Sequence, residues 1–220
     1  MDVLSERLRT AAEPLWQAQL EHPFVRGIAD GTLDPDCFRY YLRQDYLFLI
    51  EYARTLALAC ARAPQLALME RFAELTRATL SAEMELHRSY AQEWGISPAE
   101  LERERMSPTT RAYTDFLVRT GAAGDYAELL AALLPCMWGY SELGRALAAQ
   151  EPPAEQPYAA WIETYASDDF AQLARWCRDA LDGVASTAIE ARLQDAFLVS
   201  SRYELAFWEA AWRREAPLPG

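Results

Sequence analysis

Apolar residues recur three and four positions apart along almost the whole chain, which is the spacing of one face of an α-helix. Proline, glycine and capping residues divide the pattern: Asp34-Pro35 opens a helix, Ser97 and Glu100 form a capping box, and Gly95 suits a left-handed cap. The predicted helices cover about residues 4–20, 34–63, 65–94, 107–120, 125–149, 158–166, 168–185 and 187–214, with a short helix starting near 97.

The pattern predicts one all-α domain, a helical bundle over residues 1–220, with about 215–220 as a disordered tail. The proline-rich stretch 151–157 is interpreted as an interhelical loop, because apolar periodicity continues beyond it. Composition agrees: the 220 residues include 39 Ala and 29 Leu but only 10 Val and Ile together. Such a chain favours helix and has too few β-branched residues for a large buried sheet.

Missing residue types exclude several classes of function. The chain has no Lys, which excludes a P-loop and a Schiff-base lysine, and it has no G-x-G pair for a dinucleotide fold. Two His and no C-x-x-C make a structural zinc site a poor expectation. The net charge of −12 disfavours nucleic acid and anionic membranes as partners. No signal-peptide pattern and no apolar run of membrane length occur, so we expect a soluble cytoplasmic protein with reduced thiols.

Polar residues interrupt the apolar stripes of three long predicted helices. Asp45 interrupts the second helix and Glu204 the last, while Cys136 and Tyr140 lie one turn apart on the helix over 125–149. Burying a carboxylate without a partner costs several kcal/mol, so two of them suggest a polar cavity at the bundle centre. Pro135 precedes Cys136 and removes one backbone hydrogen bond, which predicts a kink. Such a kink can tilt the thiol of Cys136 into a cavity. Simple packing of the helix around a bend explains Pro135 equally well.

Two metal-centred alternatives are weaker. A di-iron bundle requires Glu-x-x-His motifs. Here Met84 lies three residues before His87 and Glu83 lies four before it, so the motif is absent at this histidine. His87 is interpreted as a satisfied core or surface histidine. A haem held by His22 is equally weak, since His22-Pro23 is typical of a turn. We therefore expect no metal and no cofactor, and a cysteine thiolate beside carboxylates and aromatic rings as the chemistry of the site.

Four segments of the sequence resemble the TenA family, the thiaminase II and aminopyrimidine aminohydrolase proteins. They keep the family's order and spacing over nearly the whole chain: HPFVRGIADGTLDPDCFRYYLRQDY at 22–46, LLPCMWGYSELG at 133–144, WIETYASDDF at 161–170 and SSRYELAFWEAAW at 200–212. The resemblance implies a fold similar to haem oxygenase but without haem, and a homotetramer. It also implies hydrolysis of 4-amino-5-aminomethyl-2-methylpyrimidine to the hydroxymethyl pyrimidine and ammonia in thiamin salvage, with thiamin as a poorer substrate.

The resemblance also implies roles for individual residues. Cys136, which marks the cysteine-containing branch, would be the nucleophile. Glu204 would be the acid/base group, and Asp45 would bind the edge of the aminopyrimidine. The residues implied to line the ring are Phe48, Tyr113, Tyr140 and Tyr165. Family members often have Tyr at the position of Phe48, and Phe can stack on a ring but cannot hydrogen-bond to it.

Two other functions remain open. The same scaffold could carry a non-enzymatic regulatory or interaction protein, although the intact set of Cys136, Asp45 and Glu204 favours chemistry. An enzyme with a drifted substrate is the other alternative.

Overall fold

Helices are the only regular elements among the residues that the structure describes. The structure is a computed structural model that describes residues 3–151, 153, 155–184 and 189–217. The prediction of an all-α protein is confirmed for this part of the chain. The interior backbone groups of these helices bond within their own helix, so the tertiary structure depends on how their side chains meet.

The described residues fall into two compact units. Unit 1 comprises Met1–Asp34 and Ala127–Glu209, and unit 2 comprises Pro35–Tyr126 and Ala210–Gly220. The prediction of a single domain over residues 1–220 stays a prediction. Unit 1 contains α1 (Leu4–Ala11), α2 (Glu13–Leu20), α3 (Pro23–Ala29), α10 (Ala159–Ala166), α11 (Asp168–Val184) and most of α9 (Tyr126–Ala148) and α12 (Glu190–Arg213). Unit 2 contains α4 (Pro35–Arg62), α5 (Leu66–Ala78), the π-helical turn η1 (Thr79–Glu83), α6 (Met84–Glu93), α7 (Pro98–Leu101) and α8 (Pro108–Ala123).

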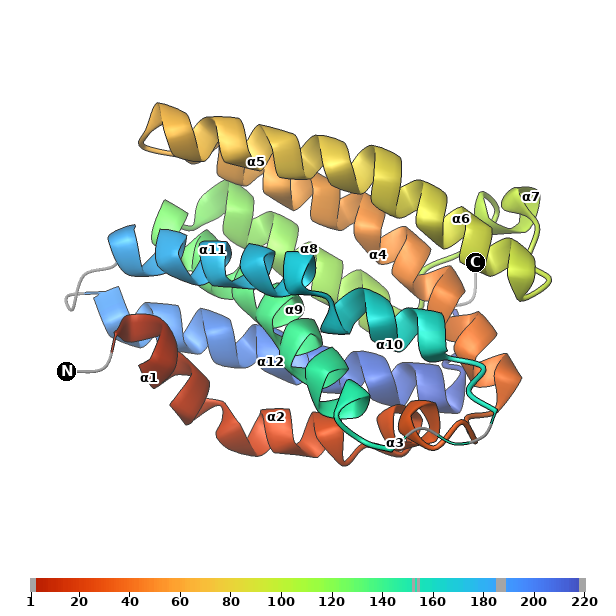
Figure 1. Cartoon of the computed structure of the whole chain (residues 1–220). Helices are drawn as coiled ribbons and strands as arrows, with labels where there is room; N and C mark the ends of the chain where they lie inside the picture. Colours follow the sequence, from red (N-terminus) through yellow and green to blue (C-terminus); the bar gives the residue numbers. More distant parts are fainter. Residues whose placement is uncertain (1–2, 152, 154, 185–188, 218–220) are drawn as a thin grey trace. The chain divides into compact units, whose positions relative to one another are not determined.

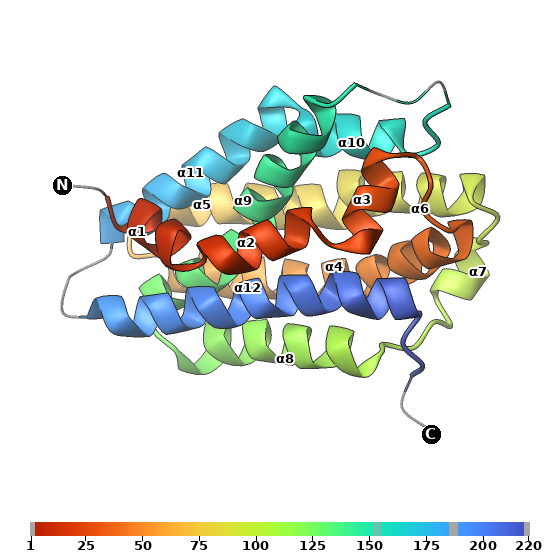
Figure 2. The same ribbon diagram turned by 90° about the horizontal axis from the view of Figure 1, so that it is seen from below.

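In unit 1, α2 runs along α12 (Figure 2). The indole of Trp16 donates a hydrogen bond to Ser201 Oγ at 3.2 Å, and the indole of Trp208 donates to Gln19 Oε1 at 3.2 Å. All four side chains are buried. These two bonds satisfy polar groups in the core and fix α2 against α12 at two levels.

In unit 2, α4 is the central helix. It packs against α5, α6 and α8, and Figure 1 shows α5 and α6 following α4. The apolar stripe predicted for this helix is confirmed as buried, with Cys60 at its end half-buried. The buried members of that stripe are Phe38, Tyr41, Leu42, Asp45, Leu49, Ala53 and Leu56.

The prediction of one helix over residues 4–20 is wrong. Two helices, α1 and α2, meet at Ala12, and Pro14 lies in the first turn of α2. Proline has no N–H to continue the preceding helix, and it is well tolerated in a first turn, so the chain restarts there. The turn predicted at His22-Pro23 is instead the start of α3, where His22 Nδ1 accepts a hydrogen bond from the N–H of Phe24 at 3.2 Å.

The prediction of one continuous α-helix over residues 65–94 is also wrong. The π-helical turn η1 separates α5 from α6 and adds one residue to the helical repeat. The helical repeat therefore shifts, and Leu80, which regular helical spacing after Thr76 places on the inward stripe, is 55% exposed. Among the side chains of this segment that the structure describes, the buried ones are Phe72, Leu75, Thr79, Met84, His87 and Ala91.

Several predicted ends are confirmed. Gly95 has φ +78°, the left-handed conformation of a helix cap, and Ser97 and Glu100 form the predicted capping box at α7. α8 continues three residues past its predicted end, where Arg62 donates hydrogen bonds to the carbonyls of Gly121 and Gly124. The arginine satisfies groups that the helix end leaves free.

The start of the predicted disordered tail is held by hydrogen bonds. The carboxylate of Glu215 accepts from the N–H of Thr109 at 3.0 Å, and its carbonyl accepts from the hydroxyl of Tyr40 at 2.9 Å. Burial raises the pKa of Tyr40 to about 12, so its hydroxyl stays a donor at neutral pH. Residues 218–220 lie outside the described part of the chain.

The capping box at α7 makes a prediction about pH and stability. The backbone N–H and hydroxyl of Ser97, with Arg43, lower the pKa of Glu100 from 4.5 to about 2. A lowered carboxyl pKa stabilises the folded state above about pH 4.5, and this contribution is lost as the pH falls towards 2. Glu100→Gln should therefore have a lower urea midpoint than the wild type at pH 7, and the gap should narrow from pH 5 to pH 3. A gap that does not change with pH would contradict this role of Glu100.

Candidate active site

Two contacts, two helical turns apart, join α9 to α12 in unit 1. The hydroxyl of Ser200 donates a hydrogen bond to the carbonyl of Ala132 at 2.7 Å. Eight residues further along each helix, the rings of Tyr140 and Trp208 lie 5.2 Å apart between centroids. Both helices advance from the first contact to the second, so these segments run in the same direction. The pair of contacts fixes their register.

Cys136 and Glu204 occupy the turn between these two contacts. Each lies four residues after the first contact and four before the second, and residues four apart share a helix face. Glu204 is buried, at 2% exposure, and Cys136 is half-buried. Pro135 lies inside α9 directly before the cysteine, as predicted. The structure therefore places the predicted nucleophile and the predicted acid/base group at one level of two neighbouring helices.

An aromatic cluster adjoins this level in unit 1. The rings of Tyr140 and Tyr165, both predicted site residues, lie 4.8 Å apart. Trp161 lies 4.7 Å from Tyr165 and 6.1 Å from Tyr140, and it contacts Trp208 edge-on at 6.3 Å. The sequence analysis did not assign Trp161, although it stands one turn before Tyr165 on α10. Such a cluster offers flat apolar faces and phenol hydroxyls to a heteroaromatic ligand.

A second cluster lies in unit 2, on α4 and the helices that pack against it. Asp45 and Phe48 are three residues apart on α4, and both are buried. The ring of Phe48 lies 5.0 Å from that of Tyr113 on α8 and 5.6 Å from that of Tyr52. Phe48 therefore presents an apolar ring surface beside a tyrosine. All three predicted residues of this cluster are below 6% exposed.

Gln44, the neighbour of Asp45, holds the start of α8 against α4. Its Oε1 accepts hydrogen bonds from the N–H of Ser107 at 2.9 Å and from the hydroxyl of Thr110 at 2.8 Å. Its amide donates to the carbonyl of Arg105 at 3.1 Å. Tyr113 follows Thr110 by three residues, so the glutamine fixes the part of α8 that carries it. The sequence analysis missed Gln44, and only its place beside Asp45 could have indicated it.

The carboxylate of Asp45 has a partner that the sequence analysis did not assign to it. Nε2 of His87, on α6, lies 2.5 Å from Asp45 Oδ2, and both side chains are buried. Of the two interpretations of His87, a satisfied core or a satisfied surface histidine, the structure bears out the first. An ionised carboxylate only accepts hydrogen bonds, so the imidazole nitrogen is the donor in this bond.

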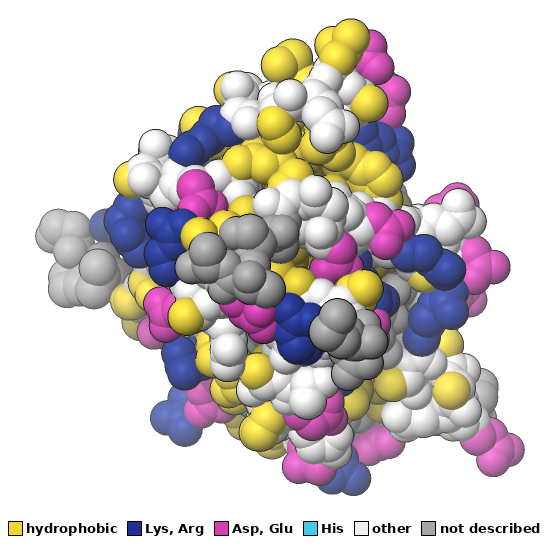
Figure 3. Space-filling view, turned by 90° about the vertical axis from the view of Figure 1, so that its left-hand side faces the viewer, with side chains coloured by type: hydrophobic (Ala, Val, Ile, Leu, Met, Phe, Trp, Pro, Cys, Tyr) yellow, Lys and Arg dark blue, Asp and Glu magenta, His cyan; other side chains and the backbone are white. Residues whose placement is uncertain are grey.

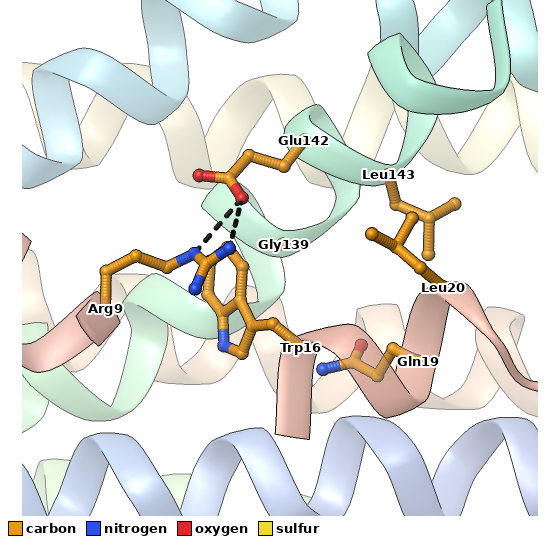
Figure 4. Close-up of a pocket in the computed structure, with 7 residues that line it drawn as sticks. All are labelled: Arg9, Trp16, Gln19, Leu20, Gly139, Glu142 and Leu143. Carbon is orange, nitrogen blue, oxygen red and sulfur yellow. Dashed lines mark hydrogen bonds and ion pairs between the residues drawn. The ribbon is translucent and has the colours of Figure 1, made fainter. Parts of the chain in front are cut away.

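Two hollows elsewhere in the units contain none of the predicted site residues. Figure 4 shows one in unit 1, where Arg9 donates to Glu142 through two nitrogens at 3.0 and 3.1 Å. The guanidinium also lies 4.2 Å from the ring of Trp16. This cavity of about 20 Å³ has room for about one water molecule. The contacts of Arg9 with Glu142 and Trp16 join α1, α2 and α9. The cavity itself is too small for a metabolite.

The second hollow, of about 460 Å³, lies in unit 2 between α4, α5 and η1. Figure 3 shows the side of the molecule on which α4 gives way to α5. Hydrophobic side chains gather in the upper part of that view. Leu66, at 70% exposure, and Leu80 are among the exposed apolar residues of this region. The hollow is lined by Ala57, Cys60, Ala73, Thr76, Arg77, Leu80 and Ser81.

The described residues hold no cluster of three or more His, Cys, Asp or Glu side chains that could bind a metal ion. Among the same residues, none of the helices has both the length and the apolar character needed to cross a bilayer.

Comparison with known proteins gives the family. The family model described as TENA/THI-4/PQQC matches residues 9–214, so the chain belongs to this family. An aminopyrimidine aminohydrolase of Halalkalibacterium halodurans is 43% identical over 205 residues, which are 91% of this chain and 92% of that protein. The resemblance to the TenA family is thereby confirmed, and so is the prediction that the chain is an enzyme, a hydrolase.

Solved structures confirm the fold. A TenA family transcription regulator from Silicibacter sp. TM1040 is 33% identical, with a TM-score of 0.90 over 95% of this chain and 96% of that chain. A domain with a heme oxygenase-like fold from Shewanella denitrificans is 15% identical, with a TM-score of 0.75 over 97% of this chain and 93% of that chain. The expectation of a fold similar to haem oxygenase is therefore correct.

Gly144 on α9 makes a prediction about the aromatic cluster. A Cβ at this position would lie 2.5 Å from the backbone carbon of Tyr165 and 2.7 Å from its Cβ. Gly144→Ala must push α10 away from α9, which should cost roughly 1–3 kcal/mol of stability. It should also displace the ring of Tyr165 from Tyr140, which near-ultraviolet circular dichroism would detect.

Gly183 provides the matched control, since a Cβ there meets no atom within 4 Å. Gly183 lies in α11, so Gly183→Ala should leave the aromatic signal unchanged and add up to about 1 kcal/mol of stability. Equal effects of the two substitutions would show that close packing at Gly144 is not what constrains α10.

Proposed function

We propose that the chain is an aminopyrimidine aminohydrolase of thiamin salvage. It would hydrolyse 4-amino-5-aminomethyl-2-methylpyrimidine to the 5-hydroxymethyl pyrimidine and ammonia. The observation that carries the proposal is the pair of contacts between α9 and α12, which brackets Cys136 and Glu204 at one level. The 43% identity to an enzyme of this name supports the choice of substrate.

The remaining predicted residues receive binding roles in this proposal. The carboxylate of Asp45 accepts a hydrogen bond from the exocyclic amine of the pyrimidine. Phe48 stacks on the ring, and the phenols of Tyr113, Tyr140 and Tyr165 line it or hydrogen-bond to it. The contact between Phe48 and Tyr113 supports stacking, because it presents two ring surfaces side by side.

The proposed mechanism is covalent. Direct displacement of ammonia from the methylene carbon is difficult, so the thiolate of Cys136 adds first to C6 of the ring and breaks its aromaticity. The ring gains a proton as the carbon–sulfur bond forms. The electron pair of the adduct then expels the amine and leaves an exocyclic methylene. Water adds to that methylene carbon, the carbon–sulfur bond breaks, and the ring loses its extra proton to regenerate the thiol.

Glu204 handles the other proton in this proposal. Its carboxyl group protonates the leaving amine, so that ammonia departs, and its carboxylate then takes a proton from the attacking water. Each turnover consumes one water molecule, releases one ammonia molecule and restores both side chains. The position of Glu204 at the level of Cys136, in a buried part of α12, supports this role.

Three further properties belong to the same proposal and rest on the family resemblance. Thiamin carries the same pyrimidine on a methylene bridge, so the same adduct would expel its thiazole and give a slower thiaminase II activity. The chain would act as a homotetramer in the cytoplasm, and the chemistry described needs no metal or cofactor.

Replacement of the nucleophile tests the mechanism. Cys136→Ser should reduce ammonia release from the aminomethyl pyrimidine by roughly a thousandfold or more, because a serine hydroxyl is a far weaker nucleophile than a thiolate. Ammonia release is measured over a panel of aminopyrimidines that includes thiamin. Cys177→Ser, which changes a thiol of α11 that has no proposed role, is the control and should keep full activity.

Two outcomes of this assay would contradict the proposal. Activity retained by Cys136→Ser would remove the cysteine adduct from the mechanism. If the wild type releases ammonia from none of the pyrimidines, a non-enzymatic role becomes the better reading, and the name of the Silicibacter relative, a transcription regulator, would direct the next experiment.

The acid/base role of Glu204 has a separate test. Glu204→Gln keeps the shape of the side chain but cannot exchange a proton, so kcat should fall by roughly 10²–10⁴, the usual range for an acid/base group. KM should change much less, and the pH–rate profile should lose one limb. A variant in which only KM changes would make Glu204 a binding residue and leave proton transfer to a tyrosine.

A further inference from the structure

Asp45 and His87 form a buried pair between two helices of unit 2. Asp45 on α4 is 5% exposed, His87 on α6 is 6% exposed, and Nε2 lies 2.5 Å from Oδ2. A carboxylate without a partner is costly at this depth, and the imidazole offsets part of the cost of burying it. Among the described residues, the hydrogen bond found for the carboxylate of Asp45 is the one with Nε2 of His87. This bond engages Oδ2.

The π-helical turn η1 turns His87 towards α4. The buried positions Phe72, Leu75 and Thr79 follow helical spacing up to the first residue of η1. After the π-helical turn, Met84 and His87 are buried and lie three residues apart. Without the extra residue, the face that meets α4 would pass through position 86, and the side chain there, Leu86, is 39% exposed. The turn therefore rotates α6 by about one residue, so that His87 faces α4 in place of Leu86.

We propose that His87 is a positioning residue for Asp45. Its Nε2–H donates to Oδ2 and fixes the plane of the carboxylate, which leaves Oδ1 to accept from the exocyclic amine of the substrate. This inference rests on the proposed function, in which Asp45 binds the aminopyrimidine. An imidazole suits the task because its ring has few rotamers, and packing on α6 holds it where a longer side chain would move.

A double-mutant cycle tests whether His87 acts through Asp45. Kinetics of ammonia release are measured for the wild type, Asp45→Asn, His87→Ala and the double variant. His87→Ala should raise KM about tenfold and lower kcat less than threefold. Without its hydrogen bond to His87, the carboxylate of Asp45 still binds the substrate, but it is no longer fixed in the best orientation. The double variant should be no worse than Asp45→Asn alone, since the histidine has nothing left to position.

Two further variants serve as a rescue and as a control. His87→Gln retains an N–H donor and should restore KM to within about threefold of the wild type. His22 is the matched control, since it is also a buried histidine paired with a carboxylate, Glu209, at 3.0 Å, but in unit 1. Effects of His22→Ala and Asp45→Asn should multiply. If the effects of His87→Ala and Asp45→Asn multiply as well, or if His87→Ala leaves KM unchanged, the positioning role is overturned.

Direct binding separates this inference from the proposed function. Titration calorimetry with 4-amino-5-hydroxymethyl-2-methylpyrimidine gives Kd for each folded variant without turnover. A wild type that binds the pyrimidine but releases no ammonia would refute the proposed function, while a tenfold weaker Kd for His87→Ala, absent in the Asp45→Asn background, would still support the inference. Unchanged Kd for His87→Ala, with ammonia release intact, would overturn the inference alone.

Discussion

In a helical core, a buried polar side chain either bonds back to its own helix, as Thr55 does to the carbonyl of Glu51, or finds its partner on another helix. This constraint governs how the helices of each unit meet. Ser200 on α12 reaches the carbonyl of Ala132 on α9, and Asp45 on α4 meets His87 on α6. Each bond satisfies a buried group that would otherwise cost free energy, and each one also permits a single register between two helices. The candidate site residues Cys136 and Glu204 lie one turn from the first of these bonds, and Asp45 takes part in the second.

Much of the secondary structure could be predicted, because its signals are local. Prolines in first turns, the capping box at Ser97 and the left-handed Gly95 all act within a few residues. The errors came from features that do not change the apolar period enough to be noticed. Pro14 lies two residues past a break at Ala12, and the π-helical turn adds one residue inside an unbroken helical pattern. Nothing in the composition of residues 79–83 distinguishes that turn from an ordinary helix.

The candidate site was predictable where a polar residue interrupts an apolar stripe. Asp45 and Glu204 were found in this way, and both are buried. The partners were not predictable, because a partner lies on another helix at a sequence distance that no spacing rule covers. His87 lies 42 residues from Asp45, and its orientation depends on the π-helical turn. The roles of these residues in binding and catalysis stay predictions.

The two carboxyl groups differ in surroundings, and this difference suits different tasks. The imidazole of His87 holds the carboxylate of Asp45 in one orientation. Glu204 lies on a face of α12 between Ser200, whose hydroxyl is committed to α9, and the indole of Trp208. In the proposed mechanism Glu204 gives a proton and later takes one, whereas Asp45 only accepts a hydrogen bond. The proposed division of tasks, with binding by Asp45 and proton transfer by Glu204, follows this difference in surroundings.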